Sequence, residues 1–269
     1  MLVLKHVTKK FAGASVLSDV SFRVDPKEFV CLTGPSGAGK STLIHLLVGA
    51  EQATSGTVEV DGVDLRRVPP GAMQLYRRRV GVVFQDCKLI DNRTVEENVA
   101  FPLEVCGYSS ALIRKRVPLL LDYMGLLPKR RTLPRELSGG EKARTAIARA
   151  VVHKPMILLA DEPTGNLDPA QSRLILDLLK EINDAGTTVI LATHDAGLVD
   201  RVQARVIRLE NGRIVRDGTG GYEADETKAA APAAAQERTE APPAEPQLVF
   251  KKAAAEAAKK VRITSIGSV

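Results

Sequence analysis

The chain has 269 residues, 44% of them hydrophobic, so it is long enough for one large domain or two small ones with a substantial core. A formal net charge of +6 suits an anionic partner, whether nucleotide, nucleic acid or phospholipid, but does not choose among them. The three cysteines lack the spacing of a disulfide framework or a zinc knuckle, and no stretch approaches the roughly 18 apolar residues of a membrane span. We therefore expect a soluble chain in a reducing compartment, with one compact domain plus appendages.

The predicted strands fall into two kinds. Segments 3–11, 16–24 and 56–62 alternate apolar and polar residues, which predicts an antiparallel patch. Four other runs are almost wholly apolar and end at glycine or polar residues, as buried parallel strands do. These runs span residues 29–34, 79–85, 156–162 and 187–195. Because a helical pattern lies between residues 98 and 134, the order predicts an α/β domain with a largely parallel sheet.

A glycine-rich loop connects the first apolar run to a helical segment. Gly34, Gly39, Lys40 and Ser41 satisfy the pattern G-x-x-x-x-G-K-[ST] in this setting. Glycines let successive backbone N–H groups face a phosphate, and the helix N-terminus adds positive partial charge. Lys40 would meet the β- and γ-phosphates, and the Ser41 hydroxyl would meet Mg²⁺. A chance glycine turn is the alternative. The residues expected to contact the nucleotide are Gly34, Pro35, Ser36, Gly37, Ala38, Gly39, Lys40, Ser41 and Thr42.

Two adjacent acids end the third apolar run. The strand places Asp161 and Glu162 at its carboxyl end, where ligands bind in open α/β sheets. Asp161 can hold Mg²⁺ through water, which leaves Glu162 to act as the base that activates an attacking water. The alternative is that the two acids only cap the strand before Pro163.

The composition changes abruptly after residue 221. The next stretch is rich in Ala, Pro and Glu with little apolar bulk, so we predict a disordered tail over residues 219–269. Residues 222–247 carry six acids against two bases, and residues 248–269 carry five bases against one acid. The basic end could bind anionic lipid or a partner, but a solvated tail without direct lipid contact is the favoured interpretation.

A further motif, "LSGGE" at residues 137–141, lies between the glycine loop and the acidic strand. Together with Gln85, Asp168 and His194 in that order, it resembles the motif set of ATP-binding-cassette ATPases over residues 1–218. The resemblance implies a P-loop NTPase cassette with a RecA-like parallel core, an antiparallel β subdomain and a helical signature subdomain. It also implies two cassettes packed head to tail as a homodimer, with ATP and Mg²⁺ between them.

The resemblance assigns roles to individual residues. His194 and Gln85 would join Lys40 and Glu162 in catalysis, and Gln85 would also join Ser41 and Asp161 in holding Mg²⁺. Phe11 would stack on adenine, although taken alone an aromatic residue there is more often core, just as a histidine at a strand end is more often structural. The groups expected to bind the partner's ATP in trans are Ser138, Gly139, Gly140 and Asp168.

Within the superfamily, "FQDCKLIDNRTVEENVAFPLEVCG" and "LLADEPTGNLDP" resemble the FtsE family of cell-division ATPases, which pair with the membrane protein FtsX. Lipoprotein-releasing and macrolide-export cassettes share "EPTGNLD" and remain the alternative. The chain departs from the FtsE pattern at Lys142 and Ala143, where two glutamines are common, and in its long tail. Cassettes that act on ribosomes or DNA, and a nucleotide-gated scaffold without turnover, are disfavoured because no recognition motif is present and the catalytic set is intact.

The resemblance also implies a location and a docking surface. The chain would lie peripherally on the cytoplasmic face of the bacterial inner membrane, held by an FtsX-like integral membrane partner, with the division site as a candidate position. The partner would dock near Gln85 and the helical subdomain, and nucleic acid is not expected as a partner. The candidate docking residues are Lys88, Leu89, Ile90, Asn98 and Phe101. Lobe packing is the alternative role for these side chains.

Overall fold

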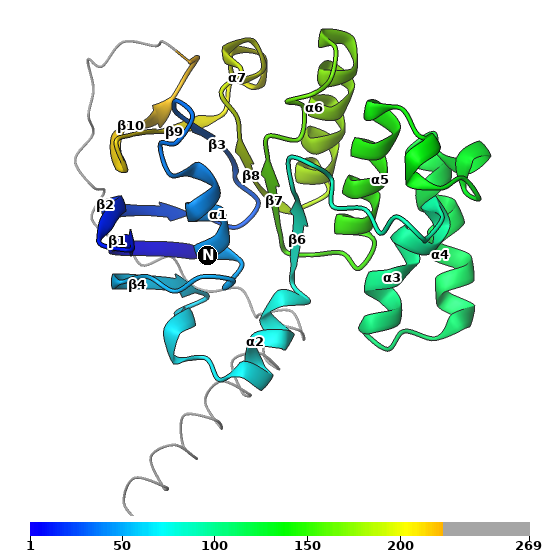
Figure 1. Cartoon of the computed structure of the whole chain (residues 1–269), viewed down its shortest axis with the longest axis horizontal. Helices are drawn as coiled ribbons and strands as arrows, with labels where there is room; N and C mark the ends of the chain where they lie inside the picture. Colours follow the sequence, from blue (N-terminus) through cyan, green and yellow to red (C-terminus); the bar gives the residue numbers. More distant parts are fainter. Residues whose placement is uncertain (223–269) are drawn as a thin grey trace, which may run out of the picture.

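The computed structural model describes residues 1–222, which form two β-sheets and a group of helices (Figure 1). The last strand ends at Thr219, and the predicted tail from residue 223 onward lies outside the described residues. Across this described part, none of the helices is both long and apolar enough to cross a bilayer.

The central sheet contains the four strands predicted to be buried and parallel. These are β3 (Phe29–Thr33), β6 (Val80–Val83), β7 (Ile157–Asp161) and β8 (Thr188–Ala192), in the spatial order β3-β8-β7-β6. Each pairs with its neighbours in parallel, and every residue of β7 and β8 is buried, so the prediction is confirmed. The carboxyl ends of the four strands therefore meet at one edge of the sheet.

A hairpin that the sequence did not assign extends this sheet beyond β3. Strand β9 (Arg205–Glu210) pairs in parallel with β3, and β10 (Arg213–Thr219) returns antiparallel to β9. The turn between them uses Asn211 and Gly212, both with positive φ, as the two-residue Asn-Gly turn requires.

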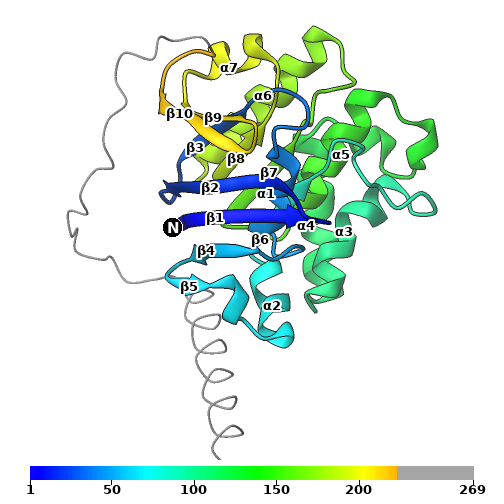
Figure 2. The same cartoon turned by 60° about the vertical axis from the view of Figure 1, so that its left-hand side comes forward.

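The second sheet is antiparallel throughout, as predicted. Its order is β2-β1-β4-β5, and helix α1 lies between it and the central sheet (Figure 2). One core cluster joins the layers, because Leu4 of β1, Ile44 of α1 and Leu32 of β3 are all buried in it. The elements are β1 (Leu2–Phe11), β2 (Ala14–Val24), β4 (Ser55–Val60), β5 (Val63–Asp64) and α1 (Lys40–Leu47).

A second core cluster holds the helices that pack on the other side of the central sheet. Two of them begin with capping boxes at Thr94 and Ser138. In each box the hydroxyl accepts from the backbone N–H of a glutamate three residues later, and that glutamate side chain accepts from the backbone N–H of the capping residue. The helices around this cluster are α3 (Val95–Val105), α4 (Ser110–Tyr123), α5 (Gly139–Val151) and α6 (Pro169–Asp184). The remaining helical elements are α2 (Pro70–Arg77), α7 (Ala196–Val202) and the single turns Leu65–Arg67, Leu127–Lys129 and Pro134–Glu136.

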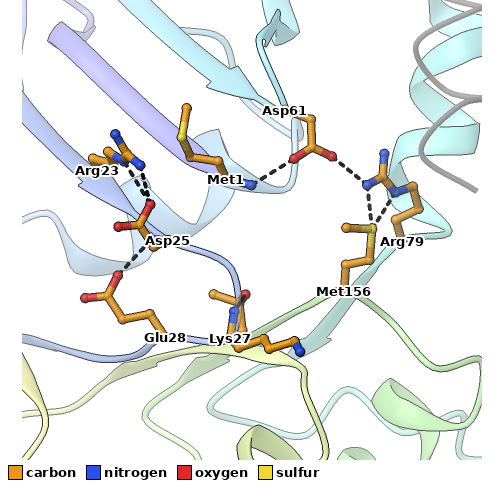
Figure 3. Close-up of polar contacts among 9 residues, drawn as sticks. Met1, Arg23, Asp25, Lys27, Glu28, Asp61, Arg79 and Met156 are labelled. Atoms are coloured by element: carbon orange, nitrogen blue, oxygen red, sulfur yellow. Dashed lines mark hydrogen bonds and ion pairs between the residues drawn. The ribbon is translucent and has the colours of Figure 1, made fainter. Parts of the chain in front are cut away.

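A chain of polar contacts ties the antiparallel sheet to the central one (Figure 3). Asp61, after β4, accepts from the Met1 amino group and from the Arg79 guanidinium, each at 2.8 Å. Arg79 also donates to the sulfur of Met156, just before β7. Burial alone would raise the pKa of Asp61, but these two cations hydrogen-bond to the carboxylate and bring its pKa below the usual value. The contact fixes the start of β6 beneath the antiparallel sheet.

Candidate active site

The glycine loop runs from the end of β3 to the start of α1. Gly34 has φ 139° and Gly39 has φ 104°, conformations that L-residues with side chains rarely adopt. A Cβ at Gly34 would overlap the carbonyl oxygen of Leu209, so only glycine lets β9 approach the loop this closely. Helix α1 begins directly after Gly39 with no side-chain cap, which leaves its first N–H groups free to bind an anion.

Lys40 lies between the loop and the acidic strand. Its side chain is only 7% exposed, and Nζ donates to the Gly34 carbonyl oxygen at 2.8 Å. The same nitrogen is 3.5 Å from Oε1 of Glu162. A buried ammonium group beside free helix N–H groups makes this a site for a strongly anionic ligand such as a phosphate chain.

Asp161 is the last residue of β7, and its carboxylate is a candidate metal ligand. Burial raises its pKa, the nearby Glu162 charge raises it further, and a hydrogen bond from Ser41 acts in the opposite direction. Its Oδ1 is buried without a hydrogen-bond partner. Residues 1–222 contain no group of three or more His, Cys, Asp or Glu side chains that could enclose a metal. The donor set of one carboxylate and one hydroxyl fits Mg²⁺, which keeps waters and phosphate oxygens as its other ligands.

Glu162 and His194 form a hydrogen-bonded pair across two strand ends. Nδ1 of His194 lies 2.8 Å from Oε1 of Glu162, and the backbone N–H of Glu162 donates to Ala192 at 2.9 Å. Glu162 has φ 46°, a strained conformation for a non-glycine residue and one that clusters at functional sites. The glutamate side chain is 10% exposed whereas the histidine is 65% exposed. The carboxylate is therefore held in place and the imidazole faces the open side.

A pocket of about 430 Å³ lies beside the glycine loop, Glu162 and His194, and Gly34, Ala38 and Asp161 are not among the residues that line it. The structure brings together the loop, Gln85, Glu162 and His194, although they come from distant parts of the sequence. Val16 of β2 also lines the pocket, and sequence reasoning missed it because an apolar residue in an alternating strand carries no chemical signal. The lining residues are Val16, Pro35, Ser36, Gly37, Gly39, Lys40, Ser41, Thr42, Gln85, Glu162 and His194.

Other predicted site residues lie apart from this pocket. Ser138 caps α5, where its Oγ accepts from Glu141 N–H at 3.3 Å, and Asp168 caps α6 by accepting from Ala170 and Gln171 at 2.9 Å each. Phe11 ends β1 with 43% of its surface exposed and does not line the pocket. The roles predicted for Ser138, Gly139, Gly140, Asp168 and Phe11 stay predictions, because one chain does not test contacts made across a dimer or with adenine.

A second groove, of about 540 Å³, lies between α2, β6 and the helices α3 and α5. Lys88, Ile90 and Phe101 line it, as predicted for docking residues, but Leu89 packs against the helical core instead. The prediction for Asn98 is wrong, because its side chain is fully buried and hydrogen-bonds to backbone groups. No aspartate or glutamate lines this groove. Its basic side chains are Arg77, Arg78, Lys88, Arg149 and His153, and Cys106 also lines it.

Comparisons with known proteins agree with this geometry. The sequence profile of the ABC transporter family matches residues 17–165. The cell division ATP-binding protein FtsE of Mycobacterium tuberculosis is 49% identical over 223 residues, covering 82% of this chain and 97% of that protein. FtsE of Escherichia coli K12 is 46% identical over 215 residues, covering 80% and 97% respectively.

Solved structures show the same relationship. The dimeric bacterial ABC transporter cassette MJ0796 matches with a TM-score of 0.75 at 36% identity, covering 81% of this chain and 98% of that one. A post-hydrolysis dimer of MJ0796 bound to ADP and phosphate matches with the same TM-score at 35% identity. With its phosphate loop, acidic strand end and histidine assembled at one sheet edge, this chain belongs to the ABC transporter family of ATP-binding cassettes.

Proposed function

We propose that the chain is the ATP-binding and ATP-hydrolysing subunit of a membrane complex of the FtsE–FtsX type, acting as a homodimer. One observation carries the hydrolytic part. Glu162 is hydrogen-bonded to His194 at 2.8 Å and lies 3.5 Å from the buried ammonium of Lys40. A fixed carboxylate beside a phosphate-binding lysine is what activation of a water molecule for attack on a γ-phosphate needs.

The residues divide the work by position. Lys40 and the free N–H groups of α1 would bind and orient the phosphates, and Ser41, Asp161 and Gln85 are the residues that would hold Mg²⁺. Mg²⁺, when bound, neutralises charge that develops on the phosphate oxygens. Glu162 accepts the proton of the attacking water, and His194 holds the glutamate Oε1 and faces the γ-phosphate from the open side of the pocket. The strained backbone of Glu162 keeps its carboxylate at this point.

Phe11 is proposed as the adenine platform. The ammonium of Lys9 lies 4.5 Å from the centre of the Phe11 ring, and Lys9 is itself paired with Glu51 at 2.7 Å. This cation–π contact covers one face of the ring and holds its plane. The other face would stack on the base.

The signature residues complete the site only in a dimer. At the start of α5 the Ser138 hydroxyl takes up only the Glu141 N–H, which leaves the N–H groups of Gly139 and Gly140 for an anion. At the start of α6 the Asp168 carboxylate already accepts from Ala170 and Gln171, so that terminus is capped. Within one chain the phosphate pocket is lined without the signature residues. A second copy packed head to tail would bring Ser138, Gly139 and Gly140 to the partner's ATP and place Asp168 at the dimer seam, in keeping with the dimers of the related cassette MJ0796.

The groove is the proposed docking surface for the membrane partner. Its apolar floor includes Phe84, Phe101 and Pro102, and its charged side chains are basic. An apolar partner segment with acidic residues would fit it, and ATP-driven closure would pass to that partner as movement. In an FtsE–FtsX-type complex this output controls cell-wall hydrolysis in division, with the chain held peripherally on the inner membrane.

The test is ATPase activity of the purified chain alone and with the FtsX-type membrane protein that co-purifies with it. We expect hydrolysis that requires Mg²⁺, and stimulation by the partner that an Arg78→Glu variant weakens. Co-purification with a lipoprotein-releasing or macrolide-export permease instead would assign the chain to that class of transporter. Absence of hydrolysis with either partner would reject the enzymatic proposal.

A further inference from the structure

A short segment joins the nucleotide pocket to the groove. Gln85 lines the pocket, and Lys88 and Ile90 line the groove, so residues 85–90, here called the linking segment, touch both. The last ladder pair of β6 is Val83 with Ala160 on β7. The linking segment has therefore left the sheet, and its position depends on other contacts.

The backbone of the linking segment is strained. Cys87 has φ 59° and Lys88 has φ 43°, which places two successive non-glycine residues in the left-handed region. Such a conformation persists only where surrounding contacts impose it. Strain of this kind next to a site residue points to a device that positions the residue.

Arg149 of α5 supplies one of the contacts. Its two terminal nitrogens donate to the carbonyl oxygens of Cys87 at 2.7 Å and Lys88 at 2.6 Å. Among the described residues, no carboxylate lies within ion-pair distance of this guanidinium, so its partners are these backbone oxygens. The fork geometry of arginine holds both carbonyls of the strained pair at once.

Asn98 of α3 supplies a second contact, to the backbone of the linking segment. Its Oδ1 accepts from Ile90 N–H at 2.8 Å, and its Nδ2 donates to the Ile90 carbonyl at 3.1 Å. The same Nδ2 also donates to the carbonyls of Arg93 and Thr94, so the amide is satisfied on both sides. The side chain is fully buried.

We propose that Arg149 and Asn98 clamp the linking segment to the helical lobe formed by α3 and α5, and thereby position Gln85. The two contacts act from different helices, because Arg149 holds the carbonyls of Cys87 and Lys88 from α5 and Asn98 holds the backbone of Ile90 from α3. Arg149 is a positioning residue: it touches neither nucleotide nor metal, and acts through Gln85. This inference rests on the proposed ATPase function for its kinetic consequence, but the clamp itself can be measured without hydrolysis.

The first experiment measures amide hydrogen exchange of the full chain without nucleotide. In Arg149→Met, which keeps much of the side-chain volume, the amides of Cys87 and Ile90 should exchange about tenfold faster than in the parent. The amides of α5 should keep their protection. Arg205→Met is the matched control, since that guanidinium binds Glu28 and Asp217 near the other edge of the central sheet. Unchanged exchange in the linking segment of Arg149→Met would overturn the clamp.

The second experiment is a double-mutant cycle on ATP hydrolysis. Arg149→Met should lower kcat about tenfold with KM for ATP within twofold, because the phosphate loop is untouched, and Arg149→Lys should recover part of the loss. In a Gln85→Ala background, the same Arg149→Met change should alter kcat by less than about twofold. Equal losses in both backgrounds would mean that Arg149 does not act through Gln85 and would overturn the proposal. No hydrolysis by the parent chain would reject the proposed function, while the exchange result would still decide the clamp.

Discussion

The phosphate edge and the signature edge of this molecule are built in different ways. At the phosphate edge, the ends of β3, β7 and β8 bring Lys40, Asp161 and Glu162 together as buried or nearly buried charges. At the signature edge, Ser138 and Asp168 are exposed residues whose side chains cap the helices that follow them. The first edge holds most of the groups proposed for catalysis. The second holds one helix end, that of α5, with N–H groups suited to an anion, and one, that of α6, already capped by the Asp168 carboxylate.

The contrast shows which site groups the folding of one chain brings together and which it leaves for a second chain. Buried charges need partners, so the central sheet must fix the phosphate edge before any ligand arrives. Exposed helix N-termini need no buried partner, because a side-chain cap such as Ser138 or Asp168, together with water, satisfies their N–H groups. The signature edge can therefore be completed by a second copy, and under the proposed function hydrolysis would then depend on dimer closure. The predictions below test the two edges separately.

The largest effect is expected at the base. Glu162→Gln should lower kcat by about a thousandfold, because the amide cannot accept the proton of the attacking water. ATP affinity should remain within about threefold, since Lys40 and the loop are intact. Steady-state turnover and size-exclusion chromatography with Mg²⁺ and ATP measure both consequences, and the variant should accumulate as a closed dimer. Near-normal turnover would remove Glu162 from the role of base.

The glycine loop provides a matched pair of variants. In Gly34→Ala the new Cβ would strike the backbone oxygen of Leu209 at φ 139°, and neither group can rotate away. We expect a loss of about 3 kcal/mol in the free energy of unfolding and a fall of about a hundredfold in nucleotide affinity. In Gly37→Ala the Cβ enters open space, so only its φ of 78° is unfavourable, and the loss should be about 1 kcal/mol. Thermal unfolding and calorimetric titration compare them, and equal losses would contradict the close packing against β9.

The signature edge is tested by substitutions that keep the helix cap. Aspartate caps as well as serine, so Ser138→Asp should preserve the fold but place a negative charge against the partner's γ-phosphate. We expect kcat to fall about thirtyfold, with unchanged thermal stability and unchanged nucleotide binding to the monomer. Ser138→Asn, which caps without the charge, is the control and should lose less than about fivefold. If both variants turn over alike, Ser138 does not face phosphate in trans.

The smallest effect is the one that the Asp161 carboxylate has on the stability of the folded chain. Because burial raises the pKa of Asp161, its charged form is disfavoured in the fold, and stability falls as the pH rises from the pKa of the unfolded chain to the raised pKa of the folded state, above which the full cost persists. Without nucleotide or Mg²⁺, Asp161→Asn should therefore melt about 2 °C above the parent at pH 8. The difference should shrink at acidic pH, where the parent carboxylate becomes protonated. Calorimetry across that range measures it, and a variant less stable at pH 8 would contradict the cause given for the shift.

The position of the charged side chains at the phosphate edge was predictable, because the patterns that mark them are local. Lys40 follows a glycine-rich loop whose spacing is typical of phosphate binding. Asp161 and Glu162 end an apolar strand, where acidic residues are unusual. Val16 was missed and Asn98 was misplaced for the opposite reason. Val16 is ordinary until the fold turns it toward the pocket, and Asn98 resembles a surface residue until its amide is seen to satisfy backbone groups of the linking segment.

The sequence by itself determined the class of fold and the phosphate chemistry, because strand periodicity and a glycine loop act over a few neighbouring residues. Only the tertiary structure decided which distant groups meet. It joined Glu162 to His194 and Arg149 to the backbone of Cys87 and Lys88, pairs separated by dozens of residues. The physical reason is that such contacts depend on how sheet order and helix packing bring separate elements together, and no local pattern encodes those distances.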